Sequence, residues 1–237
     1  MSFECVSRTH VGLRRKINED SILAETHRGL WAVADGMGGH EAGEVASAAV
    51  VDALRSVPAS PDVDEFAAEA VEALRQVNAE LIQLARSNHN ERTIGTTVVG
   101  LAITGERFCC FWAGDSRAYW SRDGEIMRLS RDHSLVQDLV DAGMLKPEEA
   151  ERHENANVIT RAVGVRETLE VDSVSGDAKP GDVFLLASDG LTRMVYDDEI
   201  LAELGRGSLE QAADQLIEMV LARGAPDNVS LVITKVL

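Results

Sequence analysis

Four aspartates each stand in a short polar turn beside an apolar run: Asp20, Asp35, Asp189 and Asp227. Two of the apolar runs end in Asp-Gly, at Asp35 and Asp189, and the other two begin just after an acid, at Asp20 and Asp227. If strands that end in an acid lie antiparallel to strands that begin with one, all four carboxylates can meet at one rim of a sheet. A single Asp-Gly is more often an ordinary turn. The recurrence of the pattern is what predicts an acidic metal site.

Oxygen ligands indicate the kind of metal. Magnesium and manganese prefer carboxylate and carbonyl oxygens and keep several waters, whereas zinc prefers histidine and cysteine. The histidines and cysteines of this chain show no tight metal-ligand spacing. Gly36 follows Asp35, and because glycine has no Cβ, its backbone can approach an ion closely and offer the carbonyl oxygen. We therefore expect Mn²⁺ or Mg²⁺ rather than zinc.

The elements that must position these acids alternate between strand and helix periodicity. Helical spacing of apolar residues predicts helices over 41–56, 64–85, 197–204 and 208–223, with short helical pieces in 134–152. Strands are predicted over 3–9, within 21–34, and over 169–174, 182–188 and 229–236. Residues 96–129 are typical of an antiparallel meander, with Ser121-Arg122-Asp123-Gly124 as a hairpin turn.

Size and charge limit the possible classes of protein. A chain of 237 residues with 45% hydrophobic residues can bury a full core, and we expect one domain over residues 1–237. The formal net charge of −17 argues against nucleic acid or an anionic membrane as a partner, because both would repel this surface. An anionic substrate would need a local positive charge. No stretch approaches the roughly 18 apolar residues of a membrane span, so the cytoplasm is the expected location.

The three cysteines favour a reduced state. Cys109 and Cys110 are neighbours in one predicted strand, where successive side chains point to opposite faces. Together with Cys5 they make an odd number, and we expect free, mostly buried thiols.

Six short motifs occur in the order typical of metal-dependent protein phosphatases of the PP2C (PPM) type. They are Arg15-Lys16-Ile17-Asn18-Glu19-Asp20, Asp35-Gly36-Met37-Gly38-Gly39-His40, Gly95-Thr96-Thr97, Gly114-Asp115-Ser116-Arg117, Ser188-Asp189-Gly190-Leu191 and Asp227-Asn228. The chain resembles this family from about residue 3 to 236. Each motif is weak alone, but the ordered set is specific. The resemblance implies an α+β fold, a central sandwich of two antiparallel β-sheets flanked by α-helices on both faces.

The same resemblance implies a centre with two metal ions, Mn²⁺ or Mg²⁺. Asp35 corresponds to the bridging ligand and Gly36 to the residue that donates its carbonyl. Asp189 and Asp227 correspond to the remaining ligands of the first ion. Asp20 belongs to the second ion, directly or through water.

Two further acids extend the implied centre. Glu19 is a neighbour that could share the role of Asp20. Asp115 corresponds to the residue that, with Asp189, holds a weaker third ion in bacterial members.

The implied reaction is hydrolysis of phosphoserine or phosphothreonine. A hydroxide that bridges the two ions attacks phosphorus in line with the leaving oxygen. Arg15 corresponds to the phosphate-binding arginine, whose planar fork can hold two phosphate oxygens; the alternative is a surface charge beside Arg14. His40 is the candidate general acid. In the eukaryotic pattern the histidine follows Asp-Gly directly, where this chain has Met37. A metal-bound water is therefore an alternative acid, and a structural or water-ordering role is an equal alternative for His40.

The resemblance also implies partners and setting. It is to bacterial stand-alone phosphatases that oppose Hanks-type kinases, and more narrowly to those that accompany type VI secretion kinases. Phosphorylated proteins, a cognate kinase and its substrates are then the expected partners, and a monomer is the expected state. Residues 134–164 correspond to a flap beside the active site that shapes access; the alternative is a plain surface insertion.

Competing chemistries fail on spacing. A cysteine phosphatase needs arginine six positions after its cysteine, and these positions hold Val11, Asp115 and Ser116. Neither an Asp-x-Asp-x-Thr sequence nor a phosphate loop ending in Gly-Lys-Ser/Thr is present. A different class, a catalytically silent binding module, should have lost one or more of the four aspartates, and all are present. A third possibility keeps the enzyme but gives it a phosphorylated anti-sigma antagonist as target.

Overall fold

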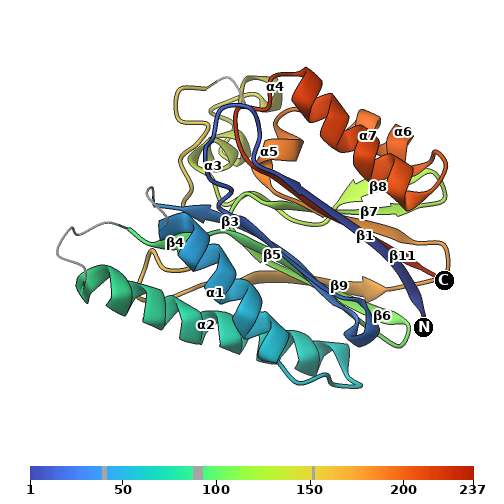
Figure 1. Ribbon diagram of the computed structural model, residues 1–237, viewed down its shortest axis with the longest axis horizontal. Coiled ribbons are helices and arrows are strands. Elements are labelled where there is room, and N and C mark those ends of the chain that lie inside the picture. The colour runs from blue at the N-terminus through green and yellow to red at the C-terminus, as the bar shows by residue number, and fades with distance from the viewer. Residues whose placement is uncertain (39–41, 88–92, 151–152) are drawn as a thin grey trace.

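Two antiparallel sheets lie face to face, and each carries helices on its outer side (Figure 1). The computed structural model describes residues 1–38, 42–87, 93–150 and 153–237. In order across the first sheet, the strands are β1 (Phe3–His10), β11 (Val229–Val236), β10 (Val183–Ala187), β7 (Arg117–Arg122) and β8 (Glu125–Arg128). The second sheet has β2 (Asp20–Glu25), β3 (Leu30–Met37), β5 (Val98–Thr104), β6 (Arg107–Ala113) and β9 (Asp172–Asp177), with β4 (Gly95–Thr96) paired to β3. The predicted sandwich is confirmed.

The helices form the two outer layers. Two long ones, α1 (Ala42–Ser56) and α2 (Val63–Ser87), pack on the second sheet. The first sheet is covered by α5 (Asp189–Thr192), α6 (Asp197–Leu204) and α7 (Leu209–Ala222). A 3₁₀ turn, η1 (Thr26–Arg28), joins β2 to β3, while α3 (Leu135–Asp141) and α4 (Pro147–Ala150) lie in the predicted flap. At the start of α7, Ser208 and Gln211 cap each other's backbone N–H groups at 3.3 and 3.2 Å.

Strand β3 shows how the layers share one core. Leu30, Ala32 and Ala34 pack against α1 and α2, whereas Trp31 and Val33 point into the space between the two sheets. This part of the strand is buried on both faces, so it is apolar from Leu30 to Ala34. The same alternation places Cys109 toward the helices and Cys110 between the sheets, as predicted, and none of the three cysteines forms a disulfide.

The predicted meander over 96–129 is wrong as a single unit. The β5–β6 hairpin belongs to the second sheet and the β7–β8 hairpin to the first. The chain crosses between them at Gly114, whose φ is 128° and where an added Cβ would lie 2.4 Å from the Thr97 side chain, so glycine is needed. Strand periodicity does not reveal which strands pair. The predicted turn is confirmed, because Asp123 and Gly124 both have positive φ, as a two-residue hairpin of type I′ requires.

One other strand is displaced from its prediction. Apolar Leu169 and Val171 suggested a strand over 169–174, but β9 begins at Asp172. Both residues pack against the helices α1 and α2 without joining the sheet.

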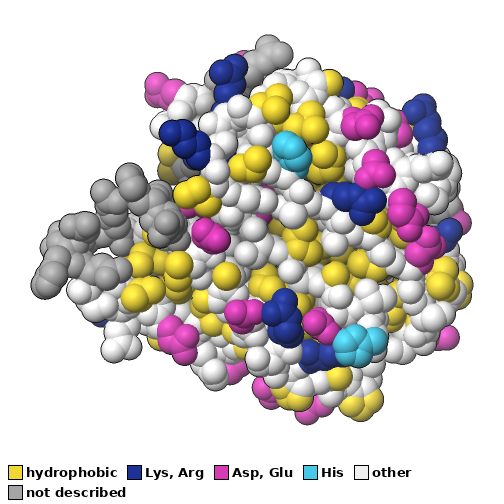
Figure 2. Space-filling model, in the orientation of Figure 1, with side chains coloured by type: hydrophobic (Ala, Val, Ile, Leu, Met, Phe, Trp, Pro, Cys, Tyr) yellow, Lys and Arg dark blue, Asp and Glu magenta, His cyan; other side chains and the backbone are white. Residues whose placement is uncertain are grey.

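The negative charges on the face shown in Figure 2 are not gathered in one patch. On the face shown in Figure 2, Asp and Glu side chains are spread over the surface with Lys and Arg side chains between them. Within the ranges that the structure describes, no helix has the length and apolar character needed to cross a membrane.

Candidate metal centre

Asp20 and Asp35 come together through strand pairing. They are direct partners in the antiparallel register of β2 with β3, and partners of this kind project from the same face of a sheet. Strand β3 continues to Met37, so Asp35 lies inside the strand and not at its end. From the other sheet, the Ser188 hydroxyl donates to Asp20 Oδ2 at 2.9 Å. The rims of the two sheets therefore meet at Asp20.

Asp189 and Asp227 reach the same rim from the first sheet. Strands β10 and β11 are antiparallel, so the residue after β10 and the residue before β11 lie at the same end. Asp189 opens α5 two residues after β10 ends, and Asp227 precedes β11 by two residues. A Cβ on Gly190 would lie 1.8 Å from the Asn228 carbonyl oxygen. Glycine is needed there because the two segments approach so closely.

The electrostatics show that these carboxylates share one neighbourhood. Burial raises the pKa of Asp35 well above its usual value, and repulsion from Asp20, Asp189, Asp115 and Asp227 raises it further. Burial and the charge of Asp189 likewise raise the pKa of Asp20 and of Asp115 to about 7. The five aspartates would repel one another if all were ionised, and a cation among them would relieve that repulsion.

The buried oxygens also lack donors. Glu19 Oε1, Asp20 Oδ1 and Asp115 Oδ1 have no hydrogen-bond partner among the described residues. Burying a carboxylate oxygen without a hydrogen-bond partner costs free energy. Each of these oxygens belongs to the acidic rim, the edge of the sandwich that carries Glu19, Asp20, Asp35, Asp115, Asp189 and Asp227. Oxygen atoms alone suit a hard divalent cation. The residues thus fit the ions that the sequence predicts.

The rim is not a closed cage of side chains. Over the described ranges, no three Asp, Glu, His or Cys side chains converge closely enough to enclose an ion. An ion bound here would have to complete its coordination with water or backbone carbonyls, which is how magnesium and manganese are commonly held. At the backbone, Gly36 donates its N–H to the Glu19 carbonyl at 3.1 Å. A Cβ at Gly36 would lie 2.1 Å from the Gly43 carbonyl, so only glycine fits between β3 and α1.

Arg15 lies beside this rim. It is in the loop after β1, and its Nη2 is 2.7 Å from Asp227 Oδ2, with half of the side chain exposed. The hydrogen bond that Arg15 donates to Asp227 is the main cause of a raised pKa for Arg15. A guanidinium at the edge of the acidic rim is therefore open to solvent and charged. His40 lies outside the described residues, and its role as general acid stays a prediction.

Asn228 holds the loop that carries Arg15. Its Nδ2 donates to the carbonyls of Val11 and Ile17 at 2.9 and 3.0 Å, and its Oδ1 accepts from the Glu19 N–H at 2.8 Å. The sequence contained Asn228 in a motif but showed no reason for it. Its side-chain partners lie more than 200 positions away, so sequence spacing could not reveal them.

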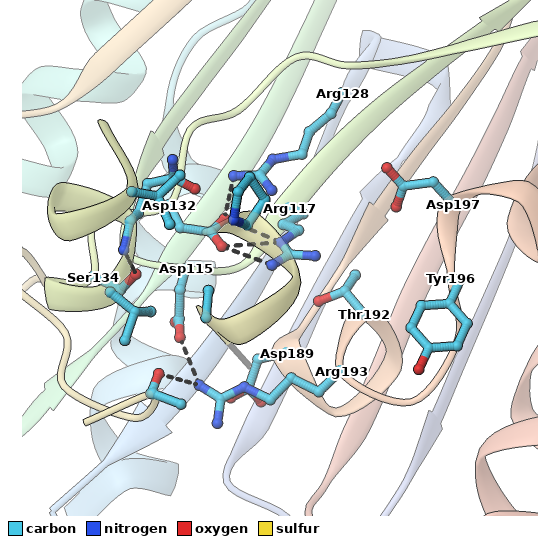
Figure 3. Close-up of a pocket in the computed structure, with 16 residues that line it drawn as sticks. Asp115, Arg117, Arg128, Asp132, Ser134, Asp189, Thr192, Arg193, Tyr196 and Asp197 are labelled. Carbon is cyan, nitrogen blue, oxygen red and sulfur yellow. Dashed lines mark hydrogen bonds and ion pairs between the residues drawn. The ribbon is translucent and has the colours of Figure 1, made fainter. Parts of the chain in front are cut away.

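Arg193 was not among the predicted site residues. Its Nε is 3.0 Å from Asp189 Oδ2 and its Nη2 is 3.1 Å from Asp115 Oδ2, as Figure 3 shows. The i, i+4 spacing of Asp189 and Arg193 was a usable signal, because residues so spaced in a helical segment face each other. Two carboxylates of the rim thus already share one cation from the chain itself.

The loop of Asp115 is braced from two sides. Thr97 Oγ1 lies 2.7 Å from Ser116 Oγ and also accepts from the Asp35 N–H at 3.3 Å. His133 is buried, accepts from the Gly114 N–H at 3.1 Å through Nδ1, and lies 3.1 Å from Asp172 through Nε2. Because burial lowers the pKa of His133, the neutral ring with its proton on Nε2 is the form these contacts support.

A cavity of about 620 Å³ opens beside Asp115 and Asp189 (Figure 3). Residues between Ser134 and Ala150, together with Ala156, line one side, and α5 and the start of α6 line the other; Arg117, Arg128 and Asp132 complete the lining. The end of the predicted flap is tied to β4, since Thr96 and Val163 exchange backbone hydrogen bonds at 3.0 and 2.9 Å.

Fold and rim together define the class of protein. The family profile described as protein phosphatase 2C matches residues 10–227. The chain belongs to the protein phosphatase 2C family.

Particular relatives sharpen this assignment. The serine/threonine protein phosphatase PstP of Mycobacterium tuberculosis is 38% identical over 230 residues, which cover 97% of this chain but 44% of that protein. The chain thus spans less than half the length of this relative. PppA of Pseudomonas aeruginosa, described as a key regulatory component of T6SS, has a solved structure with a TM-score of 0.93 and 40% identity, covering 100% and 99% of the two chains. The catalytic domain of PstP in complex with 2 manganese ions gives a TM-score of 0.88 and 36% identity, with 98% and 97% covered.

Proposed function

We propose that this chain is a protein serine/threonine phosphatase that depends on divalent metal and forms one catalytic domain over residues 1–237. The observation that carries the proposal is the rim where Asp20, Asp35, Asp189 and Asp227 meet with buried oxygens that lack donors. The names of the relatives support the same activity, since they are serine/threonine phosphatases.

Two Mn²⁺ or Mg²⁺ ions are the proposed cofactors. The two manganese ions in the PstP catalytic domain support this number and this metal. Asp35 with the Gly36 carbonyl, Asp189 and Asp227 would hold the first ion, and Asp20, with Glu19 beside it, the second. The third, weaker ion that the family resemblance implies would need Asp115 and Asp189, and Arg193 already contacts both carboxylates. When bound, divalent ions lower the pKa of water and neutralise phosphate oxygens.

The side chains of this protein supply binding and orientation. Arg15 can present its planar fork to two phosphate oxygens, because it is half-exposed and held at the rim by Asp227. Asn228 fixes the loop of Arg15 relative to Glu19. We assign proton donation to the leaving oxygen to His40 or to water.

The proposed substrates are phosphorylated proteins, in opposition to a Hanks-type kinase. The similarity to PppA supports a link to type VI secretion, because PppA is described as a regulator of that system. We further propose a cytoplasmic monomer. All four aspartates are present and buried oxygens lie ready for a cation, which favours an enzyme over a silent binding module.

The test is hydrolysis of a phosphothreonine peptide by metal-stripped protein. Turnover should return when Mn²⁺ or Mg²⁺ is added, and should stay absent in Asp35→Asn with the same metal. Circular dichroism of both proteins controls for folding. Turnover in the stripped protein without metal, or full activity in the folded variant, would overturn the proposal.

A further inference from the structure

Arg193 occupies a particular place in the acidic rim. Its guanidinium spans from Asp189 (3.0 Å) to Asp115 (3.1 Å), and it does so through two different nitrogens. Asp115 is 6% and Asp189 16% exposed, so the two carboxylates are mostly withdrawn from water. A charged fork in contact with two buried carboxylates is a strong pairing.

The charges at the acidic rim indicate a role for Arg193. Asp20, Asp35, Asp115, Asp189 and Asp227 carry five negative charges when ionised. Two divalent cations together with the Arg193 guanidinium carry five positive charges. Arg15, which is half-exposed at the edge, then remains available for the substrate phosphate. A third divalent ion beside Asp115 and Asp189 would meet the like charge of the Arg193 guanidinium, which lies 3.1 and 3.0 Å from these two carboxylates.

Arg193 is also held from the opposite side. Its Nη2 lies 3.4 Å from the Ala156 carbonyl, and its Nη1 donates to Asn157 Oδ1. Ala156 also lines the cavity beside Asp115, and Asn157 is the next residue in the chain. The guanidinium is therefore fixed by carboxylates and by neutral acceptors, and moving it would break contacts on both sides.

We propose that Arg193 is a built-in cation that occupies the space between Asp115 and Asp189 and thereby limits the centre to two divalent ions. The inference rests on the proposed function, because it presupposes that the rim binds metal. It differs from the third ion that the family resemblance implies, since here an arginine of the chain takes that position. The residue acts by positioning two carboxylates and excluding an ion, not by touching the substrate.

The test counts Mn²⁺ bound per chain, by equilibrium dialysis and by the electron paramagnetic resonance of free manganese. Wild-type protein should bind two ions, with no third ion up to millimolar Mn²⁺. Arg193→Met should bind a third ion with an affinity at least about tenfold higher than any third site of the wild type, because two buried carboxylates lose their partner. Arg193→Gln should behave in the same way and covers the case in which the first variant does not fold.

Two further variants test whether a change in the number of bound Mn²⁺ ions is specific to Arg193 and its partners. Arg206→Met removes an exposed arginine that pairs with Glu203 at 2.8 Å, and should leave the count at two. Adding Asp115→Asn to Arg193→Met should abolish the gained site. Equal third-ion binding in wild type and both Arg193 variants would overturn this inference while the proposed function stands. No manganese binding in any of the proteins would overturn both.

Discussion

Asp20 and Asp35 are direct cross-strand partners in the pairing of β2 with β3, and both are partly buried acids with raised pKa values. Like charges placed directly opposite in a sheet destabilise it. The fold nevertheless keeps them there, and Ser188 of the other sheet donates a hydrogen bond to Asp20. Such an arrangement stores repulsion in the metal-free protein, so metal binding and stability should be coupled.

Asp20→Asn should stabilise the metal-free protein in a pH-dependent way. Burial and neighbouring acids raise the pKa of Asp20 to about 7. Between its usual value near 4 and pH 7 the native state holds more protons than the unfolded state, so the free energy of unfolding falls as pH rises. The variant avoids this loss and should be more stable than wild type by about 2 kcal/mol at pH 8 but not at pH 4. Urea unfolding in excess chelator measures the difference in stability between the variant and the wild type. An equal difference at both pH values would contradict the prediction.

Arg15→Ala should chiefly raise KM for a phosphopeptide. Arg15 is half-exposed and lies 2.7 Å from Asp227, so its removal takes a charged donor from the edge of the rim without opening the core. Loss of one charge-assisted contact to phosphate predicts an increase of about tenfold or more in KM, with a smaller change in kcat. Arg14→Ala, an exposed neighbour, is the matched control. If the two variants behaved alike, Arg15 would have no special role.

Asn228→Ala should destabilise the protein. The substitution leaves the carbonyls of Val11 and Ile17 and the N–H of Glu19 without their partner. Backbone groups left without hydrogen-bond partners predict a loss of about 2–3 kcal/mol in the free energy of unfolding. Denaturant unfolding measures the loss, and KM should also rise because the Arg15 loop is released. Asn18→Ala, which removes a bond to Thr9, should cost less. A wild-type unfolding curve for Asn228→Ala would refute the anchoring role.

Glu199→Gln should lower the melting temperature at neutral pH but not in acid. Arg223 donates two hydrogen bonds to Glu199, at 2.6 and 2.8 Å, and ties α6 to the end of α7. These bonds, followed by one from the Tyr196 N–H, lower the pKa of Glu199 to about 2. The stabilisation is present above the ordinary value near 4.5 and is lost as pH falls toward 2.

The expected effect of this ion pair is small because it lies at the surface. We expect a decrease of about 2–4 °C at pH 7 that is mostly lost at pH 2.5, measured by thermal melts. Glu203→Gln provides a control, since Glu203 pairs with Arg206 within one helix turn. A decrease that persists unchanged at pH 2.5 would show that the effect does not come from the charge of Glu199.

Local sequence was enough for much of the fold. The period of apolar residues predicted the final strand over 229–236, where β11 lies, and the turn residues predicted the hairpin at Asp123 and Gly124. The four aspartates stood out because each lies beside an apolar run. These features depend on residues close together in the chain, whose backbone preferences are local.

The folded chain was needed for the rest. It shows that the β5–β6 and β7–β8 hairpins belong to different sheets, and that Arg193 lies between Asp115 and Asp189. It also shows the reach of Asn228 across more than 200 positions to Val11. Such contacts follow from how sheets and helices bury their apolar faces against one another. That packing joins segments far apart in sequence, so neither spacing nor residue type along the chain can specify them.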